Sequence, residues 1–265
     1  MREYKEKESA AGVKILLIIV FAALLMNGTA FAALTAAANK YRIKIDFFYH
    51  GSSLSVSGVS DLGADLIIKI ASPDGHQALR KKGKIAGFLW MNVGELKFDH
   101  MPSMYSLHST KKVGDILSLE DRDKYVIGLE PLGKKTVIEP VANEAEKTKW
   151  FNEFVRFKED SKLYSESNGD ISVKANGKEQ VYYALVQWPF QATPGEYIIS
   201  VYEVKDKKVV DTAEAKVVVE QVGVVKSFAA MAKNNAALYG TISILVALVA
   251  GFGVGLIFRK GGGAH

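Results

Sequence analysis

Two apolar runs stand near the ends of the chain, over residues 15–26 and residues 236–258. The first run holds 12 residues and the second holds 23, none of them charged. A helix needs about 20 apolar residues to cross the hydrocarbon layer of a bilayer. The pattern therefore predicts one transmembrane helix over residues 236–258, whereas the first run is too short to be read in the same way.

Lysine and arginine residues precede the first run, and the small-x-small sequence of Ala30, Phe31 and Ala32 follows it. This order is typical of a secretory signal peptide, here cleaved after Ala32. In an alternative interpretation the apolar character continues through residues 33–38, and the segment is kept as an N-terminal anchor. We expect cleavage, which makes residues 1–32 a signal peptide.

The residues that flank the second run predict its orientation. Tyr239 stands where an aromatic residue of the membrane interface is expected, and Arg259 and Lys260 follow the run directly. The positive-inside rule places such a basic flank in the cytoplasm. We therefore expect a single-pass protein of the bacterial inner membrane, with a cytoplasmic C-terminus and the bulk of the chain in the periplasm.

Apolar and polar residues alternate through much of the chain between the two runs. The alternation over residues 41–49 has the period of two that predicts a half-buried strand. Further strands are predicted over residues 54–56, 66–71, 88–93, 96–98, 104–108, 171–173, 181–186, 197–204 and 209–219. Short strands at this spacing favour a sandwich, and the turn at residues 193–196 before Tyr197 is typical of immunoglobulin-like sandwiches.

One helix is predicted in the middle of these strands. Asn143 and Glu146 resemble a capping box at its start. An apolar face follows at helical spacing, made of Trp150, Phe151, Phe154, Val155 and Phe157. Because aromatic residues at this spacing are usually core, we expect the helix to pack on the sheet, and an exposed partner-binding face is the alternative.

The predicted fold class is mainly β: an immunoglobulin-like β-sandwich extracytoplasmic region with a helical insertion, plus one C-terminal transmembrane helix. The predicted organisation is a signal peptide (1–32), a first β-sheet-rich half (33–112), a helical bridging segment (113–165), a second β-sheet-rich half (166–224), a juxtamembrane stalk (225–235), the transmembrane helix (236–258) and a cytoplasmic tail (259–265). One enlarged sandwich is the alternative to two separate halves.

Composition narrows the classes of function. The chain has no cysteine, which excludes disulfides and thiolate metal sites. Its net charge of +5 is mild, and its basic residues cluster only at Arg80, Lys81, Lys82 and Lys84. A nucleic-acid-binding protein carries a stronger and more clustered excess, so we expect no nucleic-acid partner and a solvated strand end or hairpin at this cluster.

The motifs of common enzyme classes are missing from the sequence. It has no nucleophile elbow, no phosphate-binding glycine loop and no His-Glu-x-x-His zinc motif. We therefore expect no enzyme, no catalytic residues and no cofactor.

The transmembrane run carries a candidate partner-binding face. Ala247, Gly251 and Gly255 are spaced four apart, so that they lie on one face of a helix and let another backbone approach closely. This spacing predicts packing against an integral membrane partner, which we expect to be polytopic. The sequence does not distinguish packing against such a partner from packing against a second copy of the chain.

A second candidate surface lies in the exported part. Trp90 and Asn92 share one side of a predicted strand, and His50 closes a strand beside a glycine. Together with Tyr105 they form a candidate ligand or partner surface at a sheet edge. The competing expectation, which we favour for Trp90, is burial in the core between the sheets.

Copper handling is the alternative function that the sequence suggests. His100, Met101, Met104 and His108 lie within nine residues, and thioether with imidazole suits Cu(I). Against this hypothesis, the residues divide between the two faces of a strand, and methionine in a β-core is usually a gap-filler.

The order and spacing of many single residues resemble a family of uncharacterised bacterial transmembrane proteins, first described from alphaproteobacteria. The matching positions are Gly51, Leu54, Gly58, Ala64, Asp65, Lys81, Lys82, Gly87, Trp90, Asn92, Phe98, Pro102, Ser103, Tyr105, Ser109, Leu238, Tyr239, Gly240, Phe258 and Arg259. The chain departs from the family pattern at His100, Met101, Met104 and His108, where small or apolar residues are usual.

The resemblance implies a signal peptide, an extracytoplasmic β-rich domain and one C-terminal span. It also implies genes beside permeases similar to sulfite and organosulfur exporters, and hence an accessory role to such a carrier. It assigns no catalytic residue.

Overall fold

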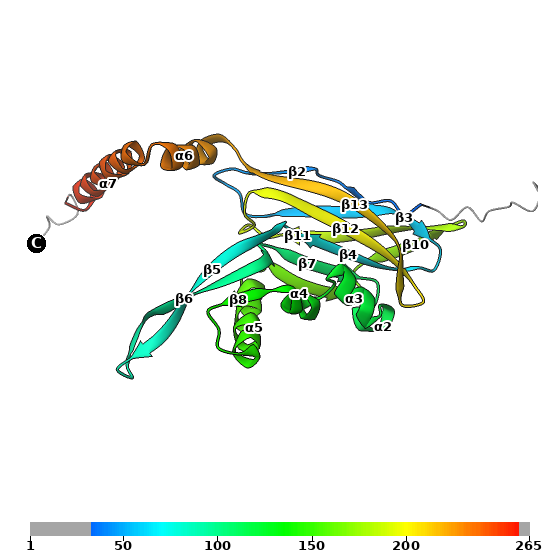
Figure 1. Ribbon diagram of the computed structural model, residues 1–265. Helices are drawn as coiled ribbons and strands as arrows, with labels where there is room; N and C mark the ends of the chain where they lie inside the picture. Colours follow the sequence, from blue (N-terminus) through cyan, green and yellow to red (C-terminus); the bar gives the residue numbers. More distant parts are fainter. Residues whose placement is uncertain (1–32, 260–265) are drawn as a thin grey trace, which may run out of the picture. The chain divides into compact units, whose positions relative to one another are not determined.

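The computed structural model describes residues 33–259, and the largest share of them forms three β-sheets (Figure 1). The four-stranded sheet has the order β1 (Ala37–Ala38), β3 (Ser52–Asp61), β11 (Glu179–Trp188) and β10 (Ser172–Asn176). The six-stranded sheet has the order β2 (Arg42–Ile45), β13 (Lys208–Gln221), β12 (Gly195–Lys205), β4 (Asp65–Ala71), β7 (Tyr105–Ser109) and β9 (Tyr164–Asn168). The three-stranded sheet has the order β5 (Asp74–Ile85), β6 (Leu89–Pro102) and β8 (Val137–Glu139). The predicted signal peptide and residues 260–265 of the predicted tail lie outside the described residues.

Six helices belong to the described part of the chain. They are α2 (Val113–Ile116), α3 (Leu119–Tyr125), α4 (Leu129–Lys135), α5 (Glu144–Asp160), α6 (Gly223–Asn234) and α7 (Ala236–Arg259). The first four gather on one side of the six-stranded sheet, as Figure 1 shows. The mainly β character and the C-terminal apolar helix confirm the predicted class, whereas the immunoglobulin-like topology stays a prediction.

A first apolar core lies between the four-stranded and six-stranded sheets. Leu54 and Val56 of β3 meet Leu66, Ile68 and Ile70 of β4 in this core. Successive side chains of a strand point to opposite faces, so these alternate residues all point inward. The two sheets therefore form a β-sandwich.

A second core covers the other face of the six-stranded sheet. Ile67, which lies between the inward residues of β4, packs there with Phe98 of β6 and with Phe151 and Phe154 of α5. Because β4 is buried on both faces, its sequence is almost continuously apolar rather than alternating. The predicted packing of this helix on the sheet is confirmed for Phe151, Phe154 and Val155, whereas Phe157, expected on the same face, is 50% exposed.

The two predicted β-sheet-rich halves are parts of a single sandwich. Strand β3 pairs with β11 and strand β4 pairs with β12, so strands from residues 33–112 and 166–224 share both large sheets. The helical segment between them is an insertion between neighbouring strands β7 and β9, which pair in parallel. The structure therefore has the enlarged sandwich that the sequence left as the alternative.

Two local predictions were wrong. The strand predicted over residues 41–49 ends at Ile45, because its partner β13 ends at Gln221, directly opposite. Trp90, which we expected in the core, has 64% of its surface exposed. Trp90 pairs with Lys84 in the outer part of the β5–β6 hairpin, which Figure 1 shows projecting beyond the sandwich.

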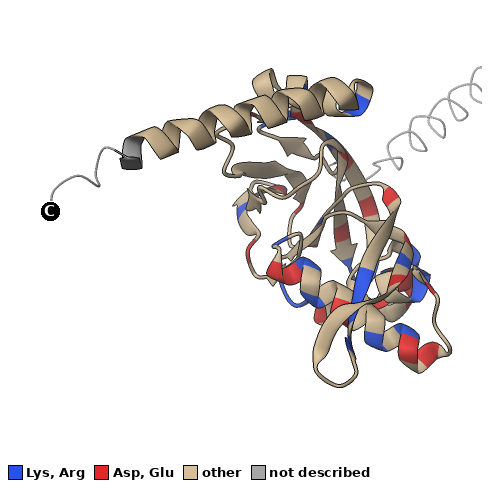
Figure 2. Ribbon diagram, turned by 90° about the vertical axis from the view of Figure 1, so that its left-hand side faces the viewer, with Lys and Arg blue, Asp and Glu red and all other residues tan. Residues whose placement is uncertain are grey.

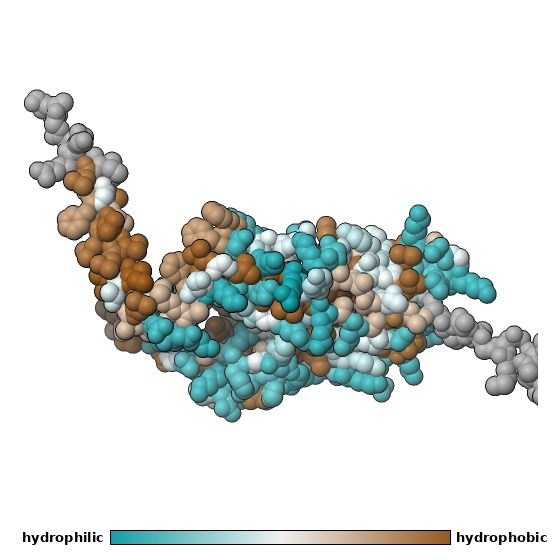
Figure 3. All heavy atoms as spheres, turned by 90° about the horizontal axis from the view of Figure 1, so that it is seen from above, coloured by the Kyte–Doolittle hydropathy of each residue, from teal (hydrophilic) through white to brown (hydrophobic). Residues whose placement is uncertain are grey.

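The C-terminal helix α7 is long and apolar enough to cross a membrane over Ala236–Leu256, a stretch of 21 residues with a mean hydropathy of 2.1. Figure 2 shows no charged residue along this stretch, and Figure 3 shows its side chains as apolar while much of the β domain is polar. The short helix α6 precedes α7 and occupies most of the predicted stalk.

Candidate functional site

The structure separates the four residues of the predicted ligand or partner surface. Trp90 and Asn92 lie on the projecting hairpin, where the Lys84 amine stands 5.3 Å from the centre of the Trp90 ring. The Asn92 side chain accepts a hydrogen bond from the Gly94 N–H at 3.1 Å. His50 lies in the loop before β3 and lines a different region.

Tyr105 is a structural residue in this arrangement. Its side chain is buried in the second core, and burial raises the pKa of its phenol. The hydroxyl accepts a hydrogen bond from the Gly128 N–H at 2.7 Å and donates one to the Val126 carbonyl. Tyr105 therefore ties β7 to the connection between α3 and α4, and it offers no surface to a ligand.

The four candidate copper ligands are dispersed. Met101 lies in the second core, where the Thr136 hydroxyl contacts its sulfur, and Met104 lies in the first core between the large sheets. His100 is exposed and His108 bonds to other residues. Among residues 33–259, no three histidine, cysteine, aspartate or glutamate side chains are grouped so that they could hold a metal ion. The geometry does not favour the copper hypothesis.

A polar network that the sequence did not reveal stands on β7. The Ser106 hydroxyl lies 2.8 Å from His108 Nε2 and 2.8 Å from the Ser165 hydroxyl of β9. His108 Nδ1 bonds to the carboxylate of Asp170, just after β9. Alternation on a strand places Ser106 and His108 on one face, but Asp170 is 62 residues from His108, and no local pattern joins them.

This network forms part of a cleft of about 690 Å³ between the two large sheets. Its lining includes His50, Ser106, His108, Asp170 and the aromatic residues Trp188 and Phe190. The serine–histidine–aspartate order is that of hydrolases, which also need backbone N–H donors for an oxyanion. Strand β7 pairs with β4 on one side and β9 on the other, which commits its N–H groups to the sheet. The network therefore gives the cleft a hydrogen-bonded polar floor.

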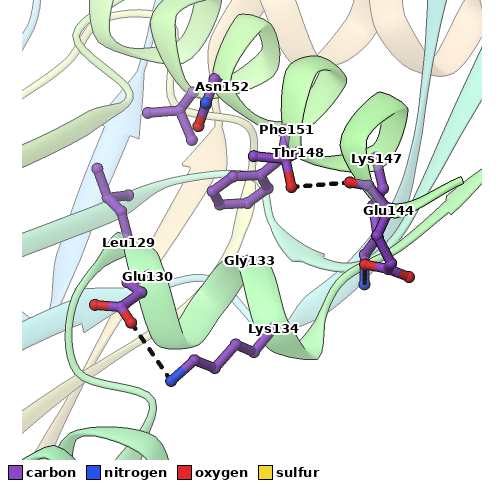
Figure 4. Close-up of a pocket in the computed structure, with 10 residues that line it drawn as sticks. Leu129, Glu130, Gly133, Lys134, Glu144, Lys147, Thr148, Phe151 and Asn152 are labelled. Atoms are coloured by element: carbon purple, nitrogen blue, oxygen red, sulfur yellow. Dashed lines mark hydrogen bonds and ion pairs between the residues drawn. The ribbon is translucent and has the colours of Figure 1, made fainter.

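A smaller pocket of about 420 Å³ lies between α4 and α5 (Figure 4). The Phe151 ring lies against Gly133, where an added Cβ atom would come within 2.9 Å of the ring. The charged residues at the rim are in ion pairs, including Lys134 with Glu130 and with Asp123. Because these charges are already paired, the pocket is best explained as the seam where the two helices meet.

The small-residue face of α7 forms a shallow groove. Ala247, Gly251 and Gly255 line it with Leu248, Phe252 and Leu256, over a volume of about 410 Å³. A Cβ atom added at Gly251 or Gly255 would meet open space in the isolated chain. The groove can therefore accept the backbone of another helix at close range.

Residues 33–260 match the model of a family described as "Putative transmembrane protein". No curated protein matches the sequence.

Proposed function

The chain belongs to this family of putative transmembrane proteins, and we propose that it is a single-span protein that serves a permease or envelope complex as a non-enzymatic accessory subunit. The proposal places the span in a bacterial inner membrane, the β domain in the periplasm and the C-terminus in the cytoplasm. Arg259 and Lys260 directly after the span support this orientation.

The groove on α7 is the observation that carries the proposal. Lipid tails are as apolar as leucine side chains, so spans associate through close packing rather than through a hydrophobic driving force. Ala247, Gly251 and Gly255 remove side-chain bulk along one line of the helix and leave its backbone approachable. A span that served only as an anchor would not need such a face.

The β5–β6 hairpin offers a second contact for the same partner outside the membrane. Its outer part exposes Phe88 (78%), Leu89 (50%) and Trp90 (64%), together with basic side chains of β5. Aromatic residues are enriched at protein interfaces, so this exposed aromatic tip is a candidate contact. Permeases similar to sulfite and organosulfur exporters, which the resemblance implies, are the partners to test first.

The test is affinity purification from native membranes through a C-terminal tag, with mass spectrometry of the recovered proteins. Gly251→Leu with Gly255→Leu fills the groove and is expected to abolish recovery of a polytopic permease. Gly253→Leu is the control, since position 253 lies about 200° around the helix from Gly251 and receives the same glycine-to-leucine change away from the groove.

The proposal requires that the control variant recover the permease as the unmodified chain does. Equal recovery with the groove filled contradicts the groove as the contact. Recovery of the tagged chain without any polytopic protein contradicts the accessory role itself.

A further inference from the structure

We propose that the end of the sandwich from which the chain leaves for α6 rests on the lipid bilayer, with Phe47, Phe48 and Phe190 inserted among the headgroups. These three residues are called the aromatic rim. The inference depends on α7 crossing a membrane, and it does not depend on the accessory role.

The pairing of β2 with β13 places the first part of the rim. The two strands run parallel and end together, with Ile45 opposite Gln221. The Val222 N–H donates to the Ile45 carbonyl at 2.9 Å, and α6 begins at the next residue. Phe47 and Phe48 therefore follow the last paired residue of β2 at the point where the chain departs for the membrane.

A tight turn keeps Phe47 and Phe48 at the surface of the domain. The Phe48 N–H donates to Asp46 Oδ1 at 3.0 Å, and the Tyr49 N–H donates to the Asp46 carbonyl at 3.3 Å. The two rings pack edge to face with centres 5.3 Å apart, and 73% and 78% of their surfaces stay exposed. Because the turn fixes both phenylalanine rings, their apolar surfaces stay exposed.

Phe190 brings a third ring to the same end. Its loop joins β11 to β12, and Gly195 at the start of β12 pairs with Val219, two residues before β13 ends. Gly51 packs this loop against the loop of Phe47 and Phe48, since a Cβ added to Gly51 would lie 3.2 Å from the Trp188 carbonyl. Phe190 is 60% exposed.

The chain between the rim and the span fits a surface-bound helix. Val224, Phe228 and Met231 lie on one face of α6, and Lys226 and Lys233 lie on the opposite face. A short helix with an apolar face and lysines opposite lies in the plane of a bilayer interface. The 12 residues of α6 span about 18 Å, so the rim is tethered close to the lipid.

The charge near the rim suits an anionic lipid surface. Lys44 on β2 is exposed beside the rim, while Arg42 pairs with Glu220 at 3.4 Å. The carboxylate of Asp46 in the turn accepts a hydrogen bond from the Phe48 N–H. Aromatic rings flanked by lysine are the combination that anchors proteins at the membrane interface.

The experiment uses the absence of cysteine from the chain. Single-cysteine variants Phe48→Cys and Phe190→Cys of the full chain are labelled with an environment-sensitive nitrobenzoxadiazole probe. Each is placed, one copy per disc, in nanodiscs of phosphatidylethanolamine and phosphatidylglycerol. Leu62→Cys is the matched control, because Leu62 is exposed in the turn between β3 and β4, at the opposite end of the sandwich.

We expect lipids with a spin label on the upper acyl chain to quench the probes at positions 48 and 190 several-fold more than the probe at position 62. Iodide in the water phase should show the reverse order. Equal iodide quenching at positions 48 and 62 overturns the proposal. Protection from iodide without quenching by lipid also overturns it, since that result means a protein contact. Val246→Cys, within the span, reports insertion of α7 separately.

Discussion

At the scale of single residues, the amine of Lys158 is held in unusual surroundings. Its Nζ lies 5.3 Å from the centre of the Phe154 ring and 5.9 Å from the centre of the Tyr164 ring, and it donates to the Ser103 carbonyl at 3.2 Å. Burial lowers the pKa of Lys158 from 10.5 to about 8. The folded protein therefore releases this proton at a lower pH than the unfolded chain does.

This pKa difference predicts a pH-dependent contribution to stability. Between pH 8 and pH 10.5 the unfolded chain binds more protons at this site, so the free energy of unfolding rises with pH. Compared with Lys158→Met, the unmodified chain should gain about 1.4 kcal/mol per pH unit at most over this window. The measurement is urea unfolding of both proteins in detergent at pH 7, 8, 9 and 10.

The exposed Lys149 on the same helix supplies the control for this experiment, as Lys149→Met. It removes a lysine from the exposed side of the helix, and its stability is measured beside that of Lys158→Met. A flat difference for Lys158→Met over the same range would contradict the account of Lys158.

Some residue placements could be predicted from sequence and others could not. Tyr197 is buried as expected after the turn at residues 193–196, and its hydroxyl donates to the Thr193 carbonyl at 2.7 Å. Trp90 also lies in a predicted strand but is exposed, because a local apolar run does not tell which hairpins another sheet covers. The bond between His108 and Asp170 depends on a distant loop and left no local signal.

At the scale of elements, α5 begins with the capping residues that the sequence predicts. Asn143 Oδ1 accepts the Glu146 N–H at 2.9 Å, and the Glu146 carboxylate accepts the Ala142 N–H at 2.8 Å. The first bond satisfies a backbone donor that the first turn of a helix leaves free, and the second ties the residue before the cap to that turn. The second core depends on them, because α5 supplies Phe151 and Phe154 to it.

Removing this cap should weaken the domain. Asn143→Ala is expected to lower the free energy of unfolding by about 0.5–2 kcal/mol, the usual cost of losing an N-cap side chain. Asn152→Ala changes an exposed asparagine inside the same helix and should be neutral or slightly stabilising. Chemical unfolding followed by circular dichroism compares the two. Equal losses in both variants would show that the cap contributes nothing.

Element ends were less predictable than element types. Strand β2 stops where β13 stops, although alternation continues to Tyr49, because a strand ends when its neighbour offers no more backbone partners. The predicted strands over residues 88–93 and 96–98 are one strand, β6. Its outer part has β5 as its partner, so the sequence there lacks a buried face to mark it.

At the scale of the whole molecule, the span and the β-rich class followed from the sequence, but the number of sandwiches did not. The paired residues of β3 and β11 are 118 to 136 positions apart in the chain, and no local pattern reports such a pairing. The small-residue face of α7 was predicted because helical spacing alone defines it. What that face contacts is the proposal made above.

The central claim is that one span holds the β domain outside the cytoplasm, and cysteine accessibility in bacterial spheroplasts tests it most directly. Two variants of the cysteine-free chain are treated with a membrane-impermeant maleimide: Leu62→Cys in the β domain and Ala264→Cys in the tail. The account predicts that position 62 is labelled in intact spheroplasts and that position 264 is labelled only after the membrane is permeabilised. Labelling of position 264 in intact spheroplasts, with position 62 protected until permeabilisation, would contradict it.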